Sequence, residues 1–138
     1  MPANLESTVR AFVKRMTSIR GRRVQRLLLR DFARFNDVFP VAAEDGGPAL
    51  LGIGEDGRVA ICRTDGRGAS APVAEWARLD GATVTIAYDL LKDSLPILSW
   101  TLWHPSFARV AGALTISAVD VARSDHARVT ELLRSLGK

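Results

Sequence analysis

The sequence contains little of what marks an exported, membrane-spanning or metal-binding protein. Its single cysteine, Cys62, excludes an internal disulfide and favours a reducing compartment. The longest apolar run, LPILSWTLW, is far shorter than the ~20 residues of a membrane-spanning helix. The first residues, MPANLESTVRAF, lack the apolar run of a signal peptide. We therefore expect a cytoplasmic protein whose 138 residues form a single domain.

Residues with metal-binding or catalytic chemistry are also scarce. Neither of the two histidines, His104 and His126, has the local spacing of a zinc site, so we predict no bound metal. The glycines of GIGEDG (52–57) match a dinucleotide-binding loop, but the following RVAICR is typical of a strand, whereas that loop requires a helix. We therefore predict a hairpin turn and no cofactor. We expect Cys62, in the same strand, to be a buried and inert thiol.

One set of side chains could nevertheless form a ligand-binding or catalytic pocket. It consists of Tyr88, Trp100, Trp103 and His104. In a shared apolar pocket, a carboxylate such as Asp89 or Asp93 could orient the imidazole for proton transfer, which would suit an enzyme or a ligand carrier. The simpler interpretation is that Trp100 fills the core, Trp103 covers the outer face of the sheet and His104 ends a strand. We favour the simpler interpretation and predict no catalytic residue.

Positive charge is concentrated in the first part of the chain. Nine basic and three acidic side chains give residues 1–40 a net charge of +6, whereas the remaining residues carry −2. One end of the molecule is therefore a candidate anion-binding surface. Arginine outnumbers lysine by 16 to 3 over the whole chain, so arginine richness alone does not indicate nucleic-acid binding.

The first 39 residues have the apolar periodicity of helices. Two apolar stripes do not line up through Gly21, which predicts a break at RGRR (20–23) between two helices. The second helix is predicted to carry apolar side chains on one face, among them Leu27, Phe35 and Phe39. Its opposite face carries an arginine ladder, flanked by Arg22, at spacings of three, four and four. The ladder consists of Arg23, Arg26, Arg30 and Arg34.

The pattern changes to strands in residues 48–121. Two apolar runs flank the Asp56-Gly57 turn, and ATVTIAYDL and ILSWTLW alternate as strands do. Residues 72–79 are compatible with either a short helix that Pro72 opens or a bent strand over residues 73–79. Residues 124–136, with Ser124 as the cap, are predicted to form a final helix. The expected fold is α+β: an N-terminal helical pair, a bent and mostly antiparallel sheet of five or six strands, and a C-terminal helix packed on the sheet.

From GRVAI through ILSWTLW and LTISAVDV into DHARVTELLRSL, the chain resembles a bacterial pleckstrin-homology-like module. The resemblance covers residues 48–136 and rests on the order of the elements. It implies a bent antiparallel sheet whose open end is plugged by the C-terminal helix. If residues 73–79 are helical, the order is more similar to roadblock-type or secretion-chaperone-type dimer modules, or to a nuclear-transport-factor-2-like pocket. Most of these families bind other proteins or lipids.

The arginine ladder therefore gives the leading functional hypothesis, a small non-enzymatic interaction or adaptor module. It would dock on an acidic protein, or self-associate, through its basic N-terminal helices. Nucleic acid is the second candidate partner, although the aromatic residues of this helix belong to its apolar face and are not free to stack on bases. A membrane is the least expected partner, because that face is needed for packing.

Overall fold

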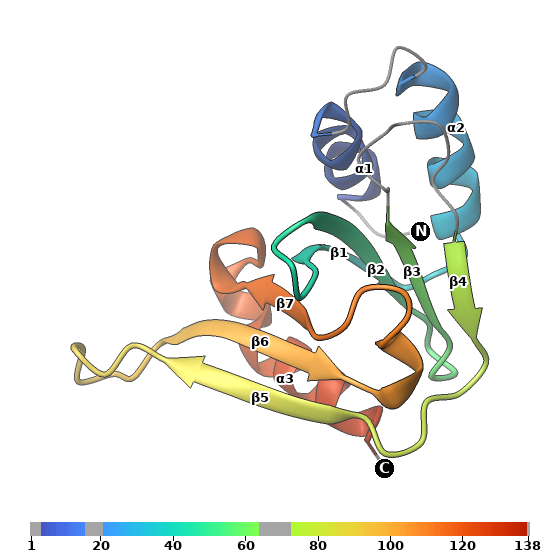
Figure 1. Cartoon of the computed structure of the whole chain (residues 1–138). Helices are drawn as coiled ribbons and strands as arrows, with labels where there is room; N and C mark the ends of the chain where they lie inside the picture. Colours follow the sequence, from blue (N-terminus) through green and yellow to red (C-terminus); the bar gives the residue numbers. More distant parts are fainter. Residues whose placement is uncertain (1–3, 16–20, 64–72, 138) are drawn as a thin grey trace.

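The computed structural model describes residues 4–15, 21–63 and 73–137, which form three α-helices and seven β-strands (Figure 1). The helices are α1 (Leu5–Lys14), α2 (Gly21–Phe32) and α3 (His126–Ser135). The strands are β1 (Asp37–Ala42), β2 (Pro48–Ile53), β3 (Val59–Arg63), β4 (Val73–Trp76), β5 (Thr83–Tyr88), β6 (Ile97–Trp103) and β7 (Leu114–Ser117). They form one antiparallel sheet in the order β4-β3-β2-β1-β7-β6-β5. Within the described segments, no helix is both long and apolar enough to cross a bilayer.

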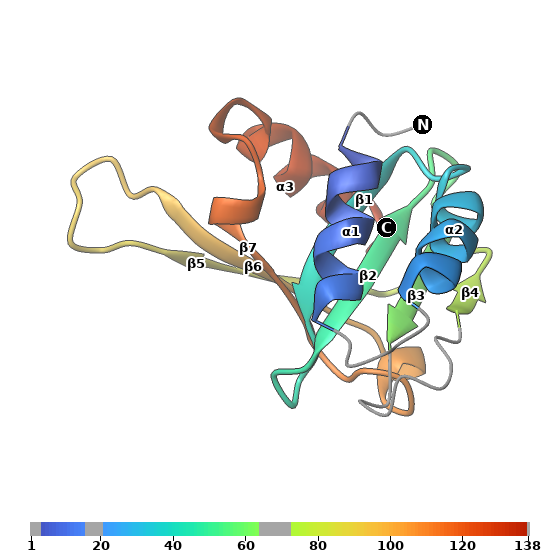
Figure 2. The ribbon, with the colours of Figure 1, turned by 90° about the horizontal axis from the view of Figure 1, so that it is seen from above.

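Two hydrophobic cores lie on opposite faces of strands β1 to β3. The first, which we call the α1–α2 core, is formed by the two N-terminal helices and residues such as Val38, Leu50 and Cys62. The second, which we call the α3 core, contains alternate residues of the same strands, such as Phe39 and Leu51, together with β6, β7 and α3. Figure 2 shows α1 and α2 lying over β1, β2 and β3. Burial on both faces explains why ALLGI is continuously apolar rather than alternating.

The helical segment of the sequence is shorter than predicted, and the sheet begins earlier. Helix α2 ends at Phe32, and residues 37–42 form β1, so the predicted helix to residue 39 and sheet from residue 48 are wrong. Phe35 and Phe39 have helical spacing but lie in different cores, on opposite faces of the sheet. Pro40 explains the extended backbone at Phe39, because a residue that precedes proline is disfavoured in the helical region. With β1 included, the strand count is seven, not five or six.

Proline is tolerated inside this sheet because β1 is paired extensively on one side alone. Six residue pairs join β1 to β2, whereas the register between β1 and β7 consists of the pair Ala42 and Thr115. A missing N–H at Pro40 therefore costs little on the side of β7. The two parts of the sheet diverge at this junction and enclose the α3 core between them (Figure 1).

Several local predictions are confirmed and others are corrected. Residues 73–76 are strand β4, so the helical alternative for this segment is wrong. The turn around Gly57, which has a φ of 87°, joins β2 to β3, and a strand follows GIGEDG. The break between α1 and α2 falls after Lys14, so RGRR is not the joint: α2 already begins at Gly21. Residues 16–20, between the helices, and residues 64–72 of the predicted loop lie outside the described residues. Helix α3 begins at His126, and the residue at its cap position is Asp125 rather than Ser124.

Candidate functional site

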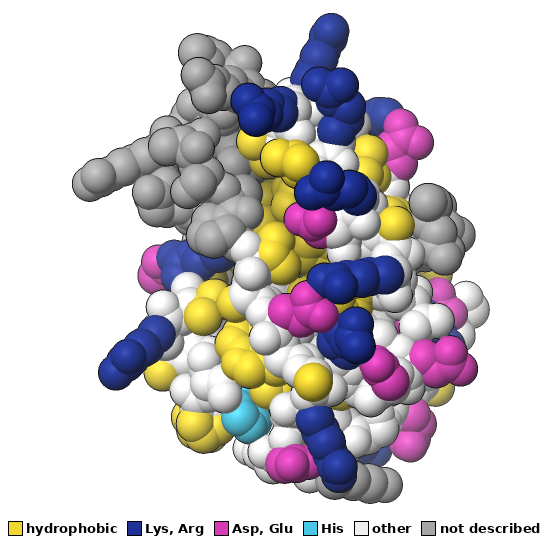
Figure 3. Space-filling view, turned by 90° about the vertical axis from the view of Figure 1, so that its right-hand side faces the viewer, with side chains coloured by type: hydrophobic (Ala, Val, Ile, Leu, Met, Phe, Trp, Pro, Cys, Tyr) yellow, Lys and Arg dark blue, Asp and Glu magenta, His cyan; other side chains and the backbone are white. Residues whose placement is uncertain are grey.

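Four arginines of α2 face away from the hydrophobic core. The side chains of Arg22, Arg23, Arg26 and Arg30 are exposed, whereas Leu28 and Phe32 of the same helix are buried. Spacings of three and four residues place these guanidinium groups along one side of the helix. We call the four residues the α2 arginine surface. Figure 3 shows Lys and Arg side chains running down the face of the molecule on which α2 and β4 lie.

Little negative charge neutralises the α2 arginine surface. The Nε of Arg30 lies 3.5 Å from the Oδ1 of Asp31, and the Arg30 side chain remains 73% exposed. Among the described residues, no ion pair involves Arg22, Arg23 or Arg26. Like charges four residues apart on a helix cost about 0.2–0.5 kcal/mol per pair. The stability of the helix therefore does not explain why these charges are grouped.

Arg34 does not belong to the same surface, although the sequence places it in the ladder. It follows the end of α2, and its guanidinium pairs with Glu75 of β4. The guanidinium carbon also lies 5.3 Å from the centre of the Phe35 ring. Arg34 therefore fastens the end of α2 to the edge of the sheet.

An apolar side chain lies within the α2 arginine surface. Leu27 was predicted on the buried face of the helix, but it is 41% exposed. It is four residues after Arg23 and three residues before Arg30, so it lies beside both on the helix. The surface therefore combines an exposed leucine with surrounding arginines.

The four residues of the predicted ligand pocket do not form one pocket. Trp100 is fully buried in the α3 core, whereas Trp103 of the same strand is 43% exposed. Tyr88 pairs with Ile97 at one end of the β5–β6 ribbon, and Trp103 pairs with Thr83 at the other end. Five strand residues separate these ends, a distance of about 17 Å. The shared pocket is therefore wrong, and Trp100 belongs to the core as the simpler interpretation predicted.

His104 is occupied by local hydrogen bonds. The backbone N–H of Ser106 donates to its Nδ1 at 3.1 Å, and its Nε2 lies 2.9 Å from the carbonyl oxygen of Asp80. A ring whose Nδ1 accepts and whose Nε2 donates is the neutral Nε2–H tautomer. Asp89, the suggested carboxylate partner, lies just after Tyr88 at the distant end of the ribbon. His104 therefore follows the last residue of β6 and caps the short turn at Pro105–Phe107.

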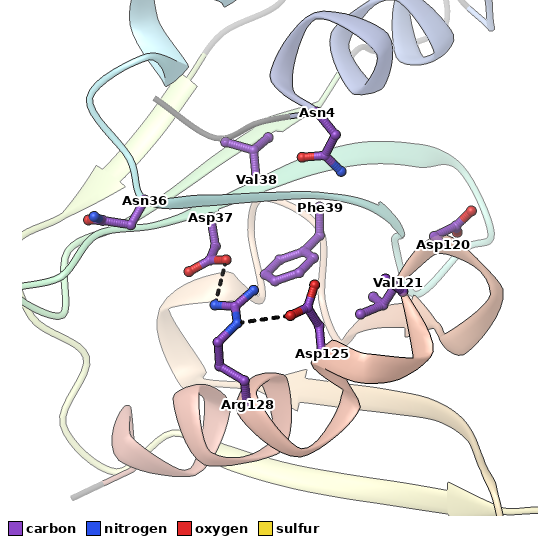
Figure 4. Close-up of a pocket in the computed structure, with 10 residues that line it drawn as sticks. Asn4, Asn36, Asp37, Val38, Phe39, Asp120, Val121, Asp125 and Arg128 are labelled. Carbon is purple, nitrogen blue, oxygen red and sulfur yellow. Dashed lines mark hydrogen bonds and ion pairs between the residues drawn. The ribbon is translucent and has the colours of Figure 1, made fainter.

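A cleft of about 520 Å³ lies between the start of β1 and the start of α3 (Figure 4). Its charged side chains are Asp37, Asp120, Asp125 and Arg128. Arg128 bridges two of the acids: its Nη1 lies 2.9 Å from Asp37 and its Nε lies 3.5 Å from Asp125. The hydrogen bond to Asp37 raises the pKa of Arg128, so this guanidinium stays charged. The sequence offers no signal for the cleft, because its residues come from segments about 90 positions apart that only the fold brings together.

Cys62 is buried in the α1–α2 core. Burial raises the pKa of its thiol to about 12, and the nearby negative charge of Asp31 adds to the shift. At pH 8 about one thiol in ten thousand would be ionised, compared with roughly one in four at the ordinary value of ~8.5. Because the thiolate is the reactive form, we expect Cys62 of the folded protein to react with Ellman's reagent at least a thousandfold (~10³) more slowly than an ordinary thiol. The thiol of the urea-unfolded chain should react at the ordinary rate, and rapid reaction of the native protein would contradict this expectation.

The described residues contain no group of three or more His, Cys, Asp or Glu side chains that could hold a metal ion. Comparisons with known protein families, curated proteins and solved structures find no match for this chain. The function therefore has to be argued from the geometry of the surfaces.

Proposed function

We propose that this chain is a small non-enzymatic interaction module, which docks through the α2 arginine surface on a protein with an acidic surface. The observation that carries the proposal is a row of exposed arginines on a helix whose apolar face is already packed in the core. Because Leu28 and Phe32 are buried, α2 has no wide apolar face to insert into a bilayer. Two copies of the same positive surface would repel each other, so the surface needs an acidic counterpart.

We also propose that the sheet and α3 form a pleckstrin-homology-like module. Support comes from the antiparallel order β4-β3-β2-β1-β7-β6-β5 and from the C-terminal helix packed in the core that the bent sheet encloses. In this interpretation α1 and α2 are additions that cover the outer face of β1 to β3. A fold alone does not define a function, so the proposed docking rests on the surface and not on this resemblance.

Leu27 favours a protein over a nucleic acid as the partner. Protein interfaces combine apolar anchors with arginine and bury both, whereas contacts to phosphates need charge alone. A leucine that is 41% exposed among arginines suits the first kind of interface. Replacement of Leu27 by serine should therefore weaken binding to a protein partner and leave binding to a nucleic acid unchanged.

The test of this proposal is charge reversal on α2. The double variant Arg26→Glu, Arg30→Glu should lose the partner captured by the wild-type protein from lysate of the native host. We expect affinity for the purified partner to fall at least tenfold, which is about 1.4 kcal/mol. The free energy of unfolding should stay within about 0.5 kcal/mol of the wild type, because both side chains are exposed. Binding is measured at about 50 mM salt, where screening is weak, and stability by urea denaturation.

The control is Arg109→Glu, Arg123→Glu, which changes the net charge equally at two exposed arginines outside α2. This variant should bind the partner as the wild type does. An equal loss of affinity in both variants would mean that the partner responds only to the total charge of the protein. A large fall in the free energy of unfolding of the α2 variant would mean that the arginines stabilise the fold and do not bind a partner. If nuclease treatment removes everything that is captured, the partner is a nucleic acid and the proposal is wrong.

A further inference from the structure

The two edges of the sheet differ in how they are protected. Strand β4 at one edge has four residues, and its Glu75 is held by ion pairs with Arg34 and Arg58. Strand β5 at the other edge has six residues, TVTIAY, with neither a charged residue nor a proline. Natural proteins usually protect a sheet edge with lysine, proline, a bulge or a covering segment. The outer edge of β5 has no lysine or proline, and its one register shift lies between Ala87 and Tyr88, at the end of the strand next to the turn. The backbone of residues 83–87 is therefore regular and can pair with another strand.

Beside this edge, the β5–β6 turn presents apolar side chains to solvent. Leu90 is 80% exposed and Leu91 is 97% exposed, and Tyr88, Leu95 and Leu98 are each about half exposed. Figures 1 and 2 both show the hairpin extending away from the rest of the molecule. These leucines add nothing to the α3 core, so the folded monomer gains no stability from them.

The turn is ordered rather than loosely attached. The N–H of Asp89 donates to the carbonyl oxygen of Pro96 at 2.8 Å, and the N–H of Leu95 donates to that of Lys92 at 3.0 Å. The Oδ1 of Asp89 accepts from the N–H of Leu91 at 3.0 Å. Leu95 has a φ of 47°, in a region that branched side chains rarely adopt and that costs about 1–2 kcal/mol. These hydrogen bonds close the turn, from which Leu90 and Leu91 project into solvent.

We propose that β5 pairs antiparallel with β5 of a second copy of this chain across a twofold axis, so that two sheets join into one. A second copy fits because an uncharged strand is complementary to itself in an antiparallel pair. The twofold axis also places the hairpin tip of each copy beside the base of the partner's ribbon. The exposed Trp103, which pairs with Thr83, lies at that base. The tip leucines of each copy thereby gain an apolar neighbour.

Charge favours this part of the surface for self-association. The chain as a whole carries +4, so two copies repel unless they meet where positive charge is absent. Residues 81–103 contain Asp89, Lys92 and Asp93, a net charge of −1. The base of the ribbon carries Arg78 and Asp80, whose Nε and Oδ1 lie 2.8 Å apart. The α2 arginine surface lies at the other end of the molecule from the hairpin tip, so the dimer leaves it open (Figure 1).

The mass of the full chain should be measured by sedimentation equilibrium from micromolar to millimolar concentration. We expect a monomer–dimer equilibrium in the wild type. Thr85→Lys puts two lysines face to face near the twofold axis, and Leu90→Ser with Leu91→Ser removes the exposed apolar tip. Each change should raise the dimer dissociation constant at least tenfold. The control Ala127→Lys adds the same charge at an exposed position of α3 and should leave the dimer intact.

A monomer throughout the concentration range, or a dimer that neither variant weakens, would overturn the proposal. Flotation with phosphatidylcholine vesicles identifies a different occupant: a monomeric wild type that floats, and loses flotation in the leucine variant, would assign the tip to a membrane instead. The serine variant alters only exposed side chains, so it remains informative if Thr85→Lys fails to fold. Arg26→Glu, Arg30→Glu should dimerise like the wild type, which separates this inference from the proposed function.

Discussion

Replacement of Trp100 by alanine is expected to lower the free energy of unfolding by about 3–5 kcal/mol. Trp100 is the largest fully buried side chain and lies on β6, beneath α3. Its Nε1 donates to the Oγ1 of Thr130 at 2.9 Å, and its ring meets His126 edge to face at 5.2 Å. Removal of the indole leaves a cavity and also removes the hydrogen bond and the ring contact that join α3 to β6. Because a domain of this size is stabilised by about 5–15 kcal/mol, the loss is a large fraction of the total.

The comparison is with Trp103→Ala, three residues further along β6. Trp103 is 43% exposed, so its loss should cost less than about 1 kcal/mol. Urea denaturation measures both variants: the midpoint for Trp100→Ala should fall steeply with an unchanged slope, and that for Trp103→Ala should barely move. Similar losses at both positions would mean that Trp103 is also needed for packing. Unequal losses would agree with the absence of a shared ligand pocket, because such a pocket would require both tryptophans to face the same cavity.

Local patterns in the sequence were sufficient for the elements whose environment is local. The alternation in ILSWTLW predicted β6 with its correct ends, Ile97–Trp103, and Asp56-Gly57 predicted the hairpin between β2 and β3. The helical spacing of Arg23, Arg26 and Arg30 predicted their common exposure. In each case the structure depends on residues close together in the sequence, or on one side of a helix facing solvent.

The sequence misled where distant residues decide the structure. Phe32, Phe35 and Phe39 have the spacing of a helix face, but the sheet requires Phe35 and Phe39 on opposite sides of β1. Arg34 fits the arginine ladder, yet Glu75, 41 residues away, removes it from that surface. Neither partner can be inferred before the topology is known. Such non-local contacts override local propensity.

The surfaces proposed for docking were predictable to different extents. The α2 arginine surface follows from the sequence, although exposed Leu27 does not. The open edge of β5 required the strand order, because no local signal tells an edge strand from a central one. A weak signal did exist for the hairpin tip: Leu90, Leu91 and Leu95 are apolar residues in a short turn between two strands, where exposed apolar side chains together suggest a contact to make.

Replacement of Gly52 by valine is expected to cost about 2–3 kcal/mol and to displace α2 from the sheet. A Cβ at Gly52 would lie 2.9 Å from Cδ1 of Phe32 and 3.1 Å from Cγ of Phe35, closer than carbon atoms pack. These rings lie 5.8 Å apart and anchor the end of α2 on β2. The absent side chain therefore sets how closely the helix approaches. Phe32→Leu, which leaves room for a side chain at position 52, should by itself lower the free energy of unfolding by about 1–2 kcal/mol.

The double variant Gly52→Val, Phe32→Leu tests whether contact with the Phe32 ring causes the loss of stability in Gly52→Val. If valine at position 52 collides with Phe32, the combined loss in urea denaturation should be smaller than the two separate losses together by at least about 0.5 kcal/mol. Additive losses would place the strain elsewhere.

The variants Gly52→Val and Gly52→Val, Phe32→Leu also test how the partner recognises α2. A partner that depends on the placement of the arginines should bind Gly52→Val more weakly and regain affinity in the double variant. A partner that responds only to positive charge should bind both equally, because neither change alters any charge.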